Sequence, residues 1–371
     1  MTASNRWPLV LPYEGVQPRF TGPVRRAGVG SAVLGRVTLG AQASLQAFAT
    51  LRADGHVVQV GDDFYLGEHA TVHIAHGLYG TTVGQHVSVG ADAVVHACTV
   101  GNDTVIQHEV AVLDGATIGQ GCVVAAGSVV FPRTVLPDGH WCEGVPAVAL
   151  RPLQAGELQA EHARVREEAC AGADLRAGVH PHHNSTQTQA AAACFVAATV
   201  VGAGHVQMAE ASSLWFGCVV DAARGPGLQL APGCNVQDNS VLRSTARVVT
   251  VGEGSTVGHN VLLHDCSVGA QVLVGMGSTL APGTVVQDRV LIAGGSTTEP
   301  GQVLEGGWLW GGRPARALSR LDERKHDLIQ RSASIYRDYA AGFASSQVAL
   351  PALADDSADI SADVSAVPAG G

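Results

Sequence analysis

Aliphatic residues recur along this chain in steps of six, with occasional slips to five. In the second half of the sequence they fall at Val251, Val257, Leu263, Val268, Val274, Leu280, Val286 and Ile292. A step of six matches neither the 3.6-residue period of a helix nor the two-residue alternation of an ordinary strand. It does match a solenoid whose coils have three short flat faces, each burying one aliphatic side chain. The pattern therefore predicts an all-β fold.

The first half of the sequence shows the same step. Its aliphatic positions are Val83, Val89, Val95, Val100, Ile106, Val112, Ile118 and Val124. Glycine often follows the aliphatic residue, as in Val257-Gly258, and at a corner it tolerates the torsions of a sharp turn. The pattern resembles the hexapeptide repeat of left-handed parallel β-helices, and a looser version extends it upstream to Leu39 and Leu230. We expect about six or seven coils of about 18 residues in each half.

The two halves are copies of one unit. The stretch "VGADAVVHAC" at 89 to 98 aligns with "VGHNVLLHDC" at 257 to 266, and this offset of 168 continues without a gap from Val83 and Val251 to Leu153 and Leu321. A chain of 371 residues also exceeds what one hydrophobic core usually organises. We therefore expect two tandem left-handed β-helices, called the first copy and the second copy below.

A helical stretch follows each copy, at 154–173 and at 321–343. In the later stretch Leu321, Leu328, Ile335 and Tyr339 predict an apolar stripe with charges between them. The expected organisation is the first copy with its helix at 1–173, a linker at 174–194 and the second copy with its helix at 195–345. The low-complexity end, 346–371, is expected to be disordered.

Charge and cysteine usage narrow the class of function. The chain has 22 Lys and Arg against 32 Asp and Glu, a net charge of −10, which argues against nucleic acid or an anionic membrane as a partner. No segment has the roughly 18 uninterrupted apolar residues of a membrane span, and the N-terminus lacks the pattern of a signal peptide. We expect a cytoplasmic protein with a small-molecule substrate. The 8 cysteines include no C-x-x-C pair, which argues against a zinc ribbon or a secreted disulfide framework.

Two histidines of the first copy are spaced to lie in register. A side chain one coil further along sits above its predecessor, at the inter-strand spacing of about 4.8 Å. His73 precedes His96 by one coil plus a short loop, and Arg243 precedes His264 in the same way in the second copy. Two outward imidazoles one coil apart can share Zn²⁺, whose bonds to nitrogen are about 2.0 to 2.1 Å. Two ligands alone do not complete such a site.

The second copy resembles the gamma-class carbonic anhydrases and their close relatives nearly end to end. The resemblance rests on the stretches "SSLWFGCVV", "NVQDNSVLR", "VTVGEGSTVGHNVLLHDCSVGAQVLVGMGS" and "GGWLWGGRPARAL". The family patterns are W-F-G-x-V-L-R-G-D, N-x-Q-D-x-S-V-L-H and V-G-H-N-x-x-L-H. The resemblance implies a trimer of left-handed β-helices with zinc between subunits. The first and third histidine ligands come from one subunit and the middle one from its neighbour.

Each copy has lost a different part of the family pattern. The second copy keeps Gln237, Asp238, His259 and His264. It has Arg243 in place of the first ligand, and Asp221 and Ala223 in place of the family's Arg and Asp. The losses in the second copy therefore include one metal ligand.

The first copy keeps Arg52, Asp54, His73 and His96. It has Ala91 in place of the middle ligand, and Gly67-Glu68 in place of Gln-Asp. The losses in the two copies are thus complementary. A contact of the family's type between the first copy and the second would assemble His73, His96 and His259, whereas the reverse contact, with Arg243, His264 and Ala91, would not bind zinc in the family's way. The resemblance implies a homo-oligomer with threefold or pseudo-threefold packing, most simply three chains forming two mixed rings.

The implied activity is the reversible hydration of CO₂ to bicarbonate by a metal-bound hydroxide, a lyase reaction. Three neutral imidazoles leave a fourth tetrahedral position for water, and zinc lowers the pKa of that water to about 7. Fe²⁺ and Co²⁺ are the alternative metals. Arg52, Asp54, Gln237 and Asp238 would orient the ligands and the nucleophile. The family's acidic proton-shuttling loop is not evident, since Gly55 follows Asp54, and His56 is a candidate replacement.

Two other classes of function remain open. The chain would be a structural protein if it kept the solenoid for assembly while its sites decayed. It would be an acyltransferase using coenzyme A, or a thioesterase, if the fold alone decided the function. A coenzyme A site predicts a basic cleft for the phosphates, yet no cluster of Lys and Arg lies beside these histidines and Lys325 is the one lysine of the chain.

Overall fold

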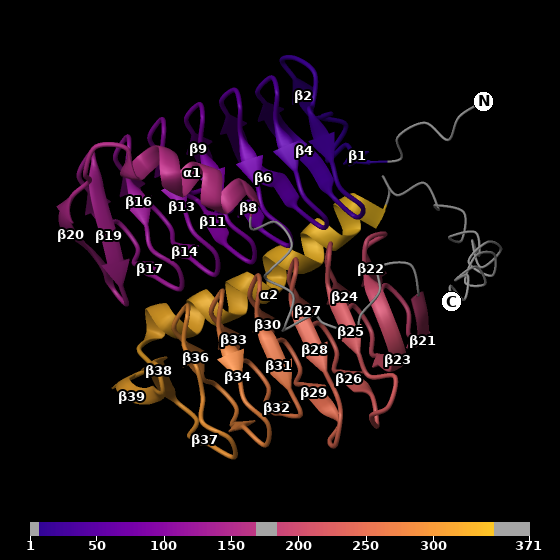
Figure 1. Ribbon diagram of the computed structural model, residues 1–371. Helices are drawn as coiled ribbons and strands as arrows, with labels where there is room; N and C mark the ends of the chain where they lie inside the picture. Colours follow the sequence, from indigo (N-terminus) through magenta and orange to yellow (C-terminus); the bar gives the residue numbers. More distant parts are fainter. Residues whose placement is uncertain (1–6, 168–183, 345–371) are drawn as a thin grey trace, which may run out of the picture.

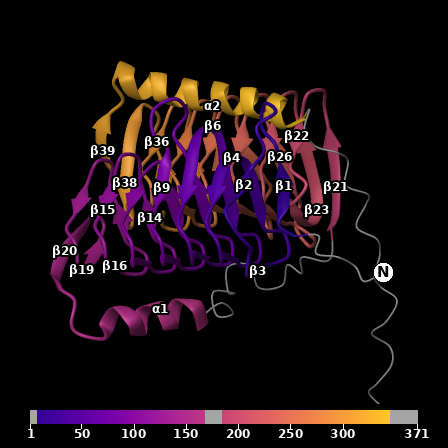
Figure 2. The same ribbon diagram turned by 90° about the horizontal axis from the view of Figure 1, so that it is seen from above.

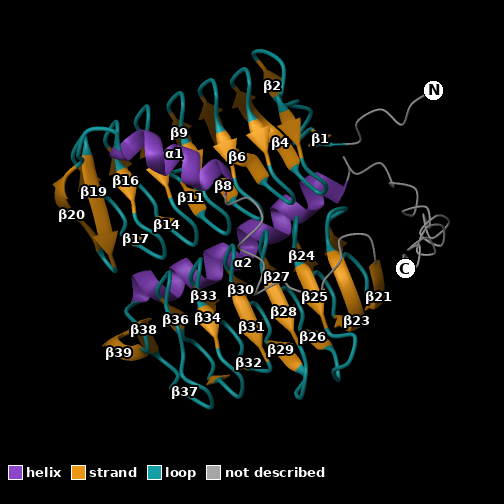
Figure 3. Ribbon diagram, viewed as in Figure 1, coloured by secondary structure: helices purple, strands orange, loops and turns teal. Residues whose placement is uncertain are grey.

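A computed structural model describes residues 7–167 and 184–344, which form two left-handed parallel β-helices lying side by side (Figure 1). Each β-helix has three faces, and the coils of both run as short strands separated by turns (Figure 3). Nearly all the regular structure is β, as the period of six predicted. The fold class predicted from the sequence, two tandem β-helices each followed by a helix, is confirmed.

The first β-helix is built from strands β1 to β20, and its long strands β4 and β6 bend across two faces. The first face contains β1 (Leu9–Leu11), β4 (Ala32–Leu39), β6 (Thr50–Val60), β8 (Thr71–His73), β11 (Val94–His96), β14 (Ala111–Val112) and β17 (Val129–Val130). The second face adds β2 (Arg19–Phe20), β9 (Thr81–Val83), β12 (Thr99–Val100), β15 (Thr117–Ile118) and β18 (Val135–Leu136). The third face contains β3 (Arg26–Ala27), β5 (Ser44–Leu45), β7 (Tyr65–Leu66), β10 (Ser88–Val89), β13 (Val105–Ile106), β16 (Val123–Val124), β19 (His140–Gly144) and β20 (Ala147–Pro152).

The second β-helix repeats this plan with strands β21 to β39. Its first face contains β21 (Asn184–Ala190), β23 (Val201–Met208), β25 (Val219–Asp221), β28 (Val241–Arg243), β31 (Leu262–His264) and β34 (Thr279–Leu280). The second face adds β26 (Leu228–Leu230), β29 (Val249–Val251), β32 (Ser267–Val268), β35 (Val285–Val286) and β37 (Val303–Leu304). The third face contains β22 (Phe195–Val196), β24 (Ser213–Leu214), β27 (Asn235–Val236), β30 (Thr256–Val257), β33 (Leu273–Val274), β36 (Leu291–Ile292), β38 (Trp308–Gly312) and β39 (Ala315–Arg320).

The register between coils explains the aliphatic period. Val89 of β10 pairs with Ile106 of β13, which pairs with Val124 of β16, and all three side chains are fully buried. Each face therefore stacks one column of aliphatic side chains inside the coil, in contact along the whole solenoid. One apolar cluster fills the first β-helix, and a second fills the other β-helix and continues to Leu9, Leu11 and Leu34 of the first copy.

Two helices follow the β-helices, close to the predicted stretches. Helix α1 (Glu157–Glu167) packs on the third face of the first copy against β10 and β13. Helix α2 (Glu323–Ala344) runs along the junction between the two β-helices, and α1 lies on the other side of the molecule (Figures 1 and 2). The predicted stripe of α2 is wrong in detail, because Leu328 is 49% exposed. The buried face of α2 consists of Ile329, Ala333, Tyr336, Tyr339, Ala340 and Phe343.

Part of the predicted linker belongs to the second β-helix. Residues 174–183 lie outside the described part of the chain, but Asn184–Ala190 forms β21, which pairs in parallel with β23. Residues 168–173 of the first helical stretch and the predicted disordered tail at 346–371 also lie outside it. In the two described segments, no helix is long and apolar enough to cross a membrane.

The two copies meet through the first face of the first copy and a corner of the second. Apolar contacts join Ala111 and Val129 of the first copy to Met276 of the second. Nearer the N-terminal ends, Phe48 packs in one cluster with Val219, Val241 and Leu262 of the second copy. The contact joins different surfaces of the two copies, which is the heterologous type of interface.

Candidate metal centre

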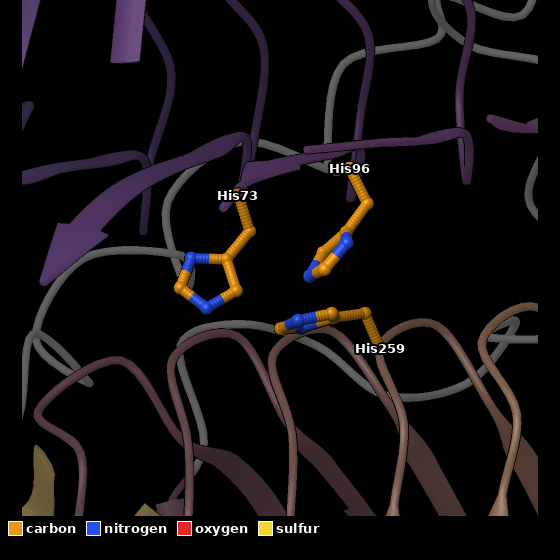
Figure 4. A group of neighbouring side chains, drawn as sticks. All are labelled: His73, His96 and His259. Atoms are coloured by element: carbon orange, nitrogen blue, oxygen red, sulfur yellow. The ribbon is translucent and has the colours of Figure 1, made fainter. Parts of the chain in front are cut away.

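Three histidines converge where the two copies meet. His73 ends β8, His96 ends β11, and His259 lies in the turn between β30 and β31 (Figure 4). The ring centroids of His73 and His96 are 5.4 Å apart, and that of His259 lies 4.9 Å and 5.6 Å from them. One nitrogen of each lies within 4.8 Å of the others, and all three side chains are buried. The structure thus brings together the ligands that the two copies were expected to share.

The sequence places His73 and His96 through the ladder of the first face. His73 pairs with His96 in parallel register, as the coil spacing predicted. His73 and His96 are 23 residues apart, whereas Ala111 and Val129, which pair further along the same ladder, are 18 apart. The loop at 74–80 contains the extra residues. The rings therefore project from one face, one above the other.

Hydrogen bonds hold the turn of His259 against the first copy. Asn260 donates to the carbonyl oxygen of His69 over 2.7 Å, and Thr71 donates its hydroxyl hydrogen to Oδ1 of Asn260 over 2.8 Å. The side-chain amide of Asn239, one coil earlier, also donates to the Thr71 hydroxyl oxygen over 2.9 Å. These hydrogen bonds join Asn239 and Asn260 of the second copy to residues of the first. The position of His259 relative to β8 is therefore fixed by polar contacts as well as by packing.

Each imidazole has an oxygen beside Nδ1. The Nδ1 of His73 is 2.8 Å from the carbonyl oxygen of Arg52, and that of His96 is 2.7 Å from Oδ1 of Asp114. The Nδ1 of His259 is 3.1 Å from Oδ2 of Asp238, which is within ion-pair distance but outside hydrogen-bond geometry. A hydrogen on Nδ1 that faces an acceptor leaves Nε2 with its lone pair, and metal-ligating histidines usually have such a partner. The arrangement therefore suits coordination through three Nε2 atoms.

Burial keeps two of these rings neutral. It lowers the pKa of His73 well below its usual value, and the nearby Arg52 lowers it further. Burial also lowers the pKa of His259 to about 4, although Asp238 opposes that shift. Neutral imidazoles are the form that binds a metal, so His73 and His259 need not lose protons when an ion enters at neutral pH.

A buried cation and two buried carboxylates surround the histidines. Arg52 bridges the copies, since its Nε donates to Asp238 over 3.0 Å while another nitrogen donates to Asp54. It also donates to the hydroxyl oxygen of Tyr336 over 2.8 Å and lies 4.4 Å above the ring of Trp215. All these groups are nearly inaccessible to solvent.

The two carboxylates differ in their protonation tendency. Burial raises the pKa of Asp54 although Arg52 lowers it, whereas Arg52 and His259 hold the pKa of Asp238 below its usual value against the effect of burial. Asp238, which faces Nδ1 of His259, is therefore the stronger acceptor of the pair. Its ionised form favours the Nδ1–H tautomer of that histidine.

Two of the predicted site residues lie apart from the three-histidine group. Gln237 is buried, and its side-chain amide contacts Oδ1 of Asn235 at 3.4 Å. His264 lies on the first face of the second copy, where Nε2 is 3.4 Å from the Thr245 hydroxyl and 3.7 Å from Oδ2 of Asp265. His56, the candidate replacement for the acidic loop, accepts a hydrogen bond at Nδ1 from the amide of Val57 over 2.8 Å.

Sequence reasoning missed three residues beside the group. Asp114 contacts His96 from the next coil, 18 residues further on, and the coil length itself could have indicated it. The hydroxyl of Tyr336 lies 3.3 Å from Nε2 of His259, and the ring of Tyr339 lies 6.4 Å from that of His73. Both tyrosines come from α2, and no pattern in the sequence places that helix at the junction.

The donor set fits a divalent ion that prefers nitrogen ligands. Three imidazole nitrogens with an open fourth position suit Zn²⁺, and imidazole also suits other first-row metals. Within residues 7–167 and 184–344, no other group of three His, Cys, Asp or Glu side chains is close enough to hold an ion.

The described cysteines do not add ligands. Six of them are buried free thiols, Cys98, Cys122, Cys142, Cys218, Cys234 and Cys266, and Cys194 is a half-buried one. Cys170 lies outside the described residues.

The paired β-helices place this chain in the class of hexapeptide-repeat proteins, and sequence comparison supports that class. The profile of the family described as "Bacterial transferase hexapeptide (six repeats)" matches residues 97–132. A protein named carbonic anhydrase from Geobacillus kaustophilus is 38% identical over 162 residues, which are 43% of this chain and 86% of that protein. Protein YrdA of Escherichia coli is 36% identical over 143 residues, or 36% of this chain and 76% of that protein.

The chain therefore belongs to the gamma-class carbonic anhydrase-like family. Gamma carbonic anhydrase 1 of Arabidopsis thaliana, a mitochondrial protein, is 33% identical over 159 residues, or 40% of this chain. The match spans 57% of that protein and 55% of its relative, gamma carbonic anhydrase 2. Each of these relatives matches less than half of this chain, in keeping with a chain that contains the unit twice.

Proposed function

We propose that this protein is a zinc-dependent carbonic anhydrase-like enzyme that hydrates CO₂ reversibly to bicarbonate between its first and second copies. One observation carries the proposal. His73 and His96 of the first copy and His259 of the second come together in one buried group, and each ring has an oxygen beside Nδ1. Neither copy alone supplies all three. Residues retained only by chance in a decayed site would have no reason to share this orientation.

The chain's own residues would bind the metal and orient the groups around it. His73, His96 and His259 would hold the metal, and zinc at such a site would lower the pKa of a bound water to about 7 and so supply a nucleophile. Arg52 would hold the two carboxylates, and with them the two copies, in place. Burial of the group excludes bulk water, which strengthens the electrostatic interactions within it.

The choice of metal follows from the ligands and the family. Nitrogen donors favour zinc over the hard ions Mg²⁺ and Ca²⁺, which prefer oxygen. Fe²⁺ and Co²⁺ also accept three imidazoles, so elemental analysis of protein purified under anaerobic conditions has to distinguish the three metals. We propose zinc because it binds imidazole tightly and needs no protection from oxidation.

Metal content and CO₂ hydration test the proposal together. We expect one zinc per chain in untagged protein, since residues 7–167 and 184–344 form one such histidine group. His259→Ala should lose both the zinc and CO₂ hydration measured by stopped flow. His264→Ala is the matched control, because this histidine lies outside the group, and it should keep both.

Two outcomes would count against the proposal. Wild-type protein without metal, or equal loss of metal from both variants, would favour the structural alternative, in which the β-helices serve assembly alone. Full zinc occupancy with no hydration of CO₂ would leave a metal centre for a different reaction. Acyl transfer or thioester hydrolysis would then be assayed with coenzyme A esters.

A further inference from the structure

Hydration of CO₂ at a buried group requires a route for a proton. Each turnover converts CO₂ and water into bicarbonate and one proton, and the proton has to reach the solvent before the next cycle. His73 is 1% exposed, and His259 and Asp54 are not exposed at all. An acceptor that links this interior to water, with a pKa near neutrality, is therefore required.

His76 links the interior to the surface. It lies in the loop at 74–80 and is exposed, yet its Nδ1 is 2.8 Å from the hydroxyl oxygen of Tyr339. Tyr339 is only 2% exposed, and its ring lies against those of both His76 and His73, at centroid distances of 5.4 Å and 6.4 Å. The tyrosine thus stands between the three-histidine group and an exposed imidazole.

Gly55 makes this pair of side chains compatible with the first copy. A Cβ at position 55 would overlap Nδ1 of His76 and would come within 2.6 Å of the Tyr339 hydroxyl. This glycine directly follows Asp54, at the place where the family's acidic loop was expected to begin. The structure therefore has room for a histidine and a tyrosine where that loop is missing.

We propose that His76 accepts the proton released during hydration, through the hydroxyl of Tyr339. This inference rests on the proposed hydration of CO₂. The hydroxyl oxygen of Tyr339 takes up one proton from the interior and gives its own to Nδ1 of His76, so the tyrosine is unchanged after the transfer. The exposed imidazolium then loses its Nε2 proton to buffer, and exchange with solvent moves the remaining ring proton from Nδ1 back to Nε2, so that Nδ1 can accept again in the next turnover. Tyr339 stays a neutral relay, since burial and the nearby Asp54 raise its pKa.

His56 fits the role less well. It is half-buried, and its Nδ1 already accepts a hydrogen bond from Val57, so that nitrogen is occupied. Its ring borders Gly80 at the far end of the same loop. Replacing His56 alone should therefore leave proton transfer intact, while replacing His76 should not.

Kinetics of zinc-loaded protein separate proton transfer from hydration itself. Exchange of ¹⁸O between CO₂ and bicarbonate at equilibrium does not need the proton to leave, whereas release of ¹⁸O-labelled water and steady-state kcat in dilute buffer do. His76→Ala and Tyr339→Phe should lower the latter two by roughly tenfold or more. The exchange between CO₂ and bicarbonate should be unchanged, and imidazole added to the buffer should restore kcat in His76→Ala.

The control and a second variant sharpen the test. His108→Ala removes an exposed histidine of the first copy that lies outside the loop at 74–80, and it should behave as wild type. Gly55→Ala should reproduce the loss, because the methyl group displaces the pair. In metal-free protein, the nitrogen NMR signals of the His76 ring should shift in Tyr339→Phe, while those of His108 should not.

The outcomes distinguish the two proposals. Wild-type protein with no exchange between CO₂ and bicarbonate would overturn the proposed hydration, and this inference with it. Normal exchange with no effect of His76→Ala on kcat would overturn the inference alone. A loss in kcat/KM and exchange together, or a loss that imidazole does not restore, would assign His76 a structural role instead.

Discussion

One guanidinium connects the two copies at the residue scale. Arg52 of the first copy contacts Asp54 of its own strand and Asp238 of the second copy, and none of the three side chains is exposed. Burial alone would lower the pKa of Arg52, but the carboxylates of Asp238 and Asp54 raise it, so the cation persists. A buried charge set of this kind is costly to disrupt because the remaining charges cannot reach water.

Removing the guanidinium should destabilise the protein strongly. We expect Arg52→Met to lower the free energy of unfolding by about 3 to 5 kcal/mol, because it leaves two buried carboxylates without a partner. Arg316→Met is the matched control, since Arg316 pairs with Glu299 at 3.7 Å with both side chains 61% exposed. That change should cost less than about 1 kcal/mol. Chemical denaturation measures both, and equal effects would contradict the argument.

Asp114 should matter for metal affinity rather than for folding. Burial would raise its pKa, but His96 holds it below the usual value, so the carboxylate stays ionised and accepts from Nδ1 of His96. We expect Asp114→Asn to weaken zinc binding roughly 10- to 100-fold, as the loss of such a partner typically does. Competition with a chromophoric chelator measures the affinity. Asp103→Asn, which removes the carboxylate beside the surface histidine His86, should leave it unchanged.

Helix α1 shows how a polar contact fixes an element. The Nδ1 of His162 in α1 shares a hydrogen bond of 2.8 Å with the hydroxyl of Ser88, and Arg166 donates to the same hydroxyl oxygen over 2.9 Å. Arg166 also donates to the carboxylate of Asp63, and the ring of His86 stacks on that of His162 at 4.3 Å. Burial and the neighbouring Arg166 disfavour a charged His162.

The stability of α1 docking should therefore fall in acid. Burial and the facing His86 and Arg166 lower the pKa of His162 from its usual 6.5 to about 4, with Asp103 opposing. Between these values the unfolded chain binds a proton that the folded chain does not, so the contribution of His162 to stability is present above pH 6.5 and is lost as the pH falls towards 4. Wild type should lose more stability than His162→Gln between pH 7 and pH 4.5. Parallel losses in urea unfolding would contradict this.

The predictability of the elements depended on whether a local pattern determines them. Val89, Ile106 and Val124 follow a period set by the coil, so the sequence was sufficient to predict the solenoid. The face of α2 was not predictable in the same way. Leu328 fits a helical stripe yet is exposed, whereas Tyr336 and Tyr339 are buried because the junction between two copies covers them.

The site was predictable at the scale of the whole molecule only through the comparison of the two copies. Missing ligands at Ala91 and Arg243 indicated that His73, His96 and His259 belong together, and the structure places these three side by side. Sequence reasoning expected rings that mix the two copies, and the structure forms the group between the two copies of one chain. The linker between the copies does not follow the period of six, so the repeat pattern did not predict how the two copies pack against each other.

A site within one chain should bind metal independently of protein concentration. We expect one zinc per chain with a constant affinity over a hundredfold dilution, because both sets of ligands travel together. Chelator competition at several protein concentrations measures this, with size-exclusion chromatography recording the oligomeric state at each. Zinc content that rises with concentration would place the working site between chains.

The division of ligands between the copies also constrains the evolution of the chain. With Ala91 in one copy and Arg243 in the other, neither half alone has a full ligand set. In a fused chain, each copy can lose a ligand that the other copy retains. Every such loss makes it more costly for the two copies to become separate proteins. The duplication is therefore hard to reverse, because a return to independent single-copy subunits would require at least one copy to regain a lost ligand.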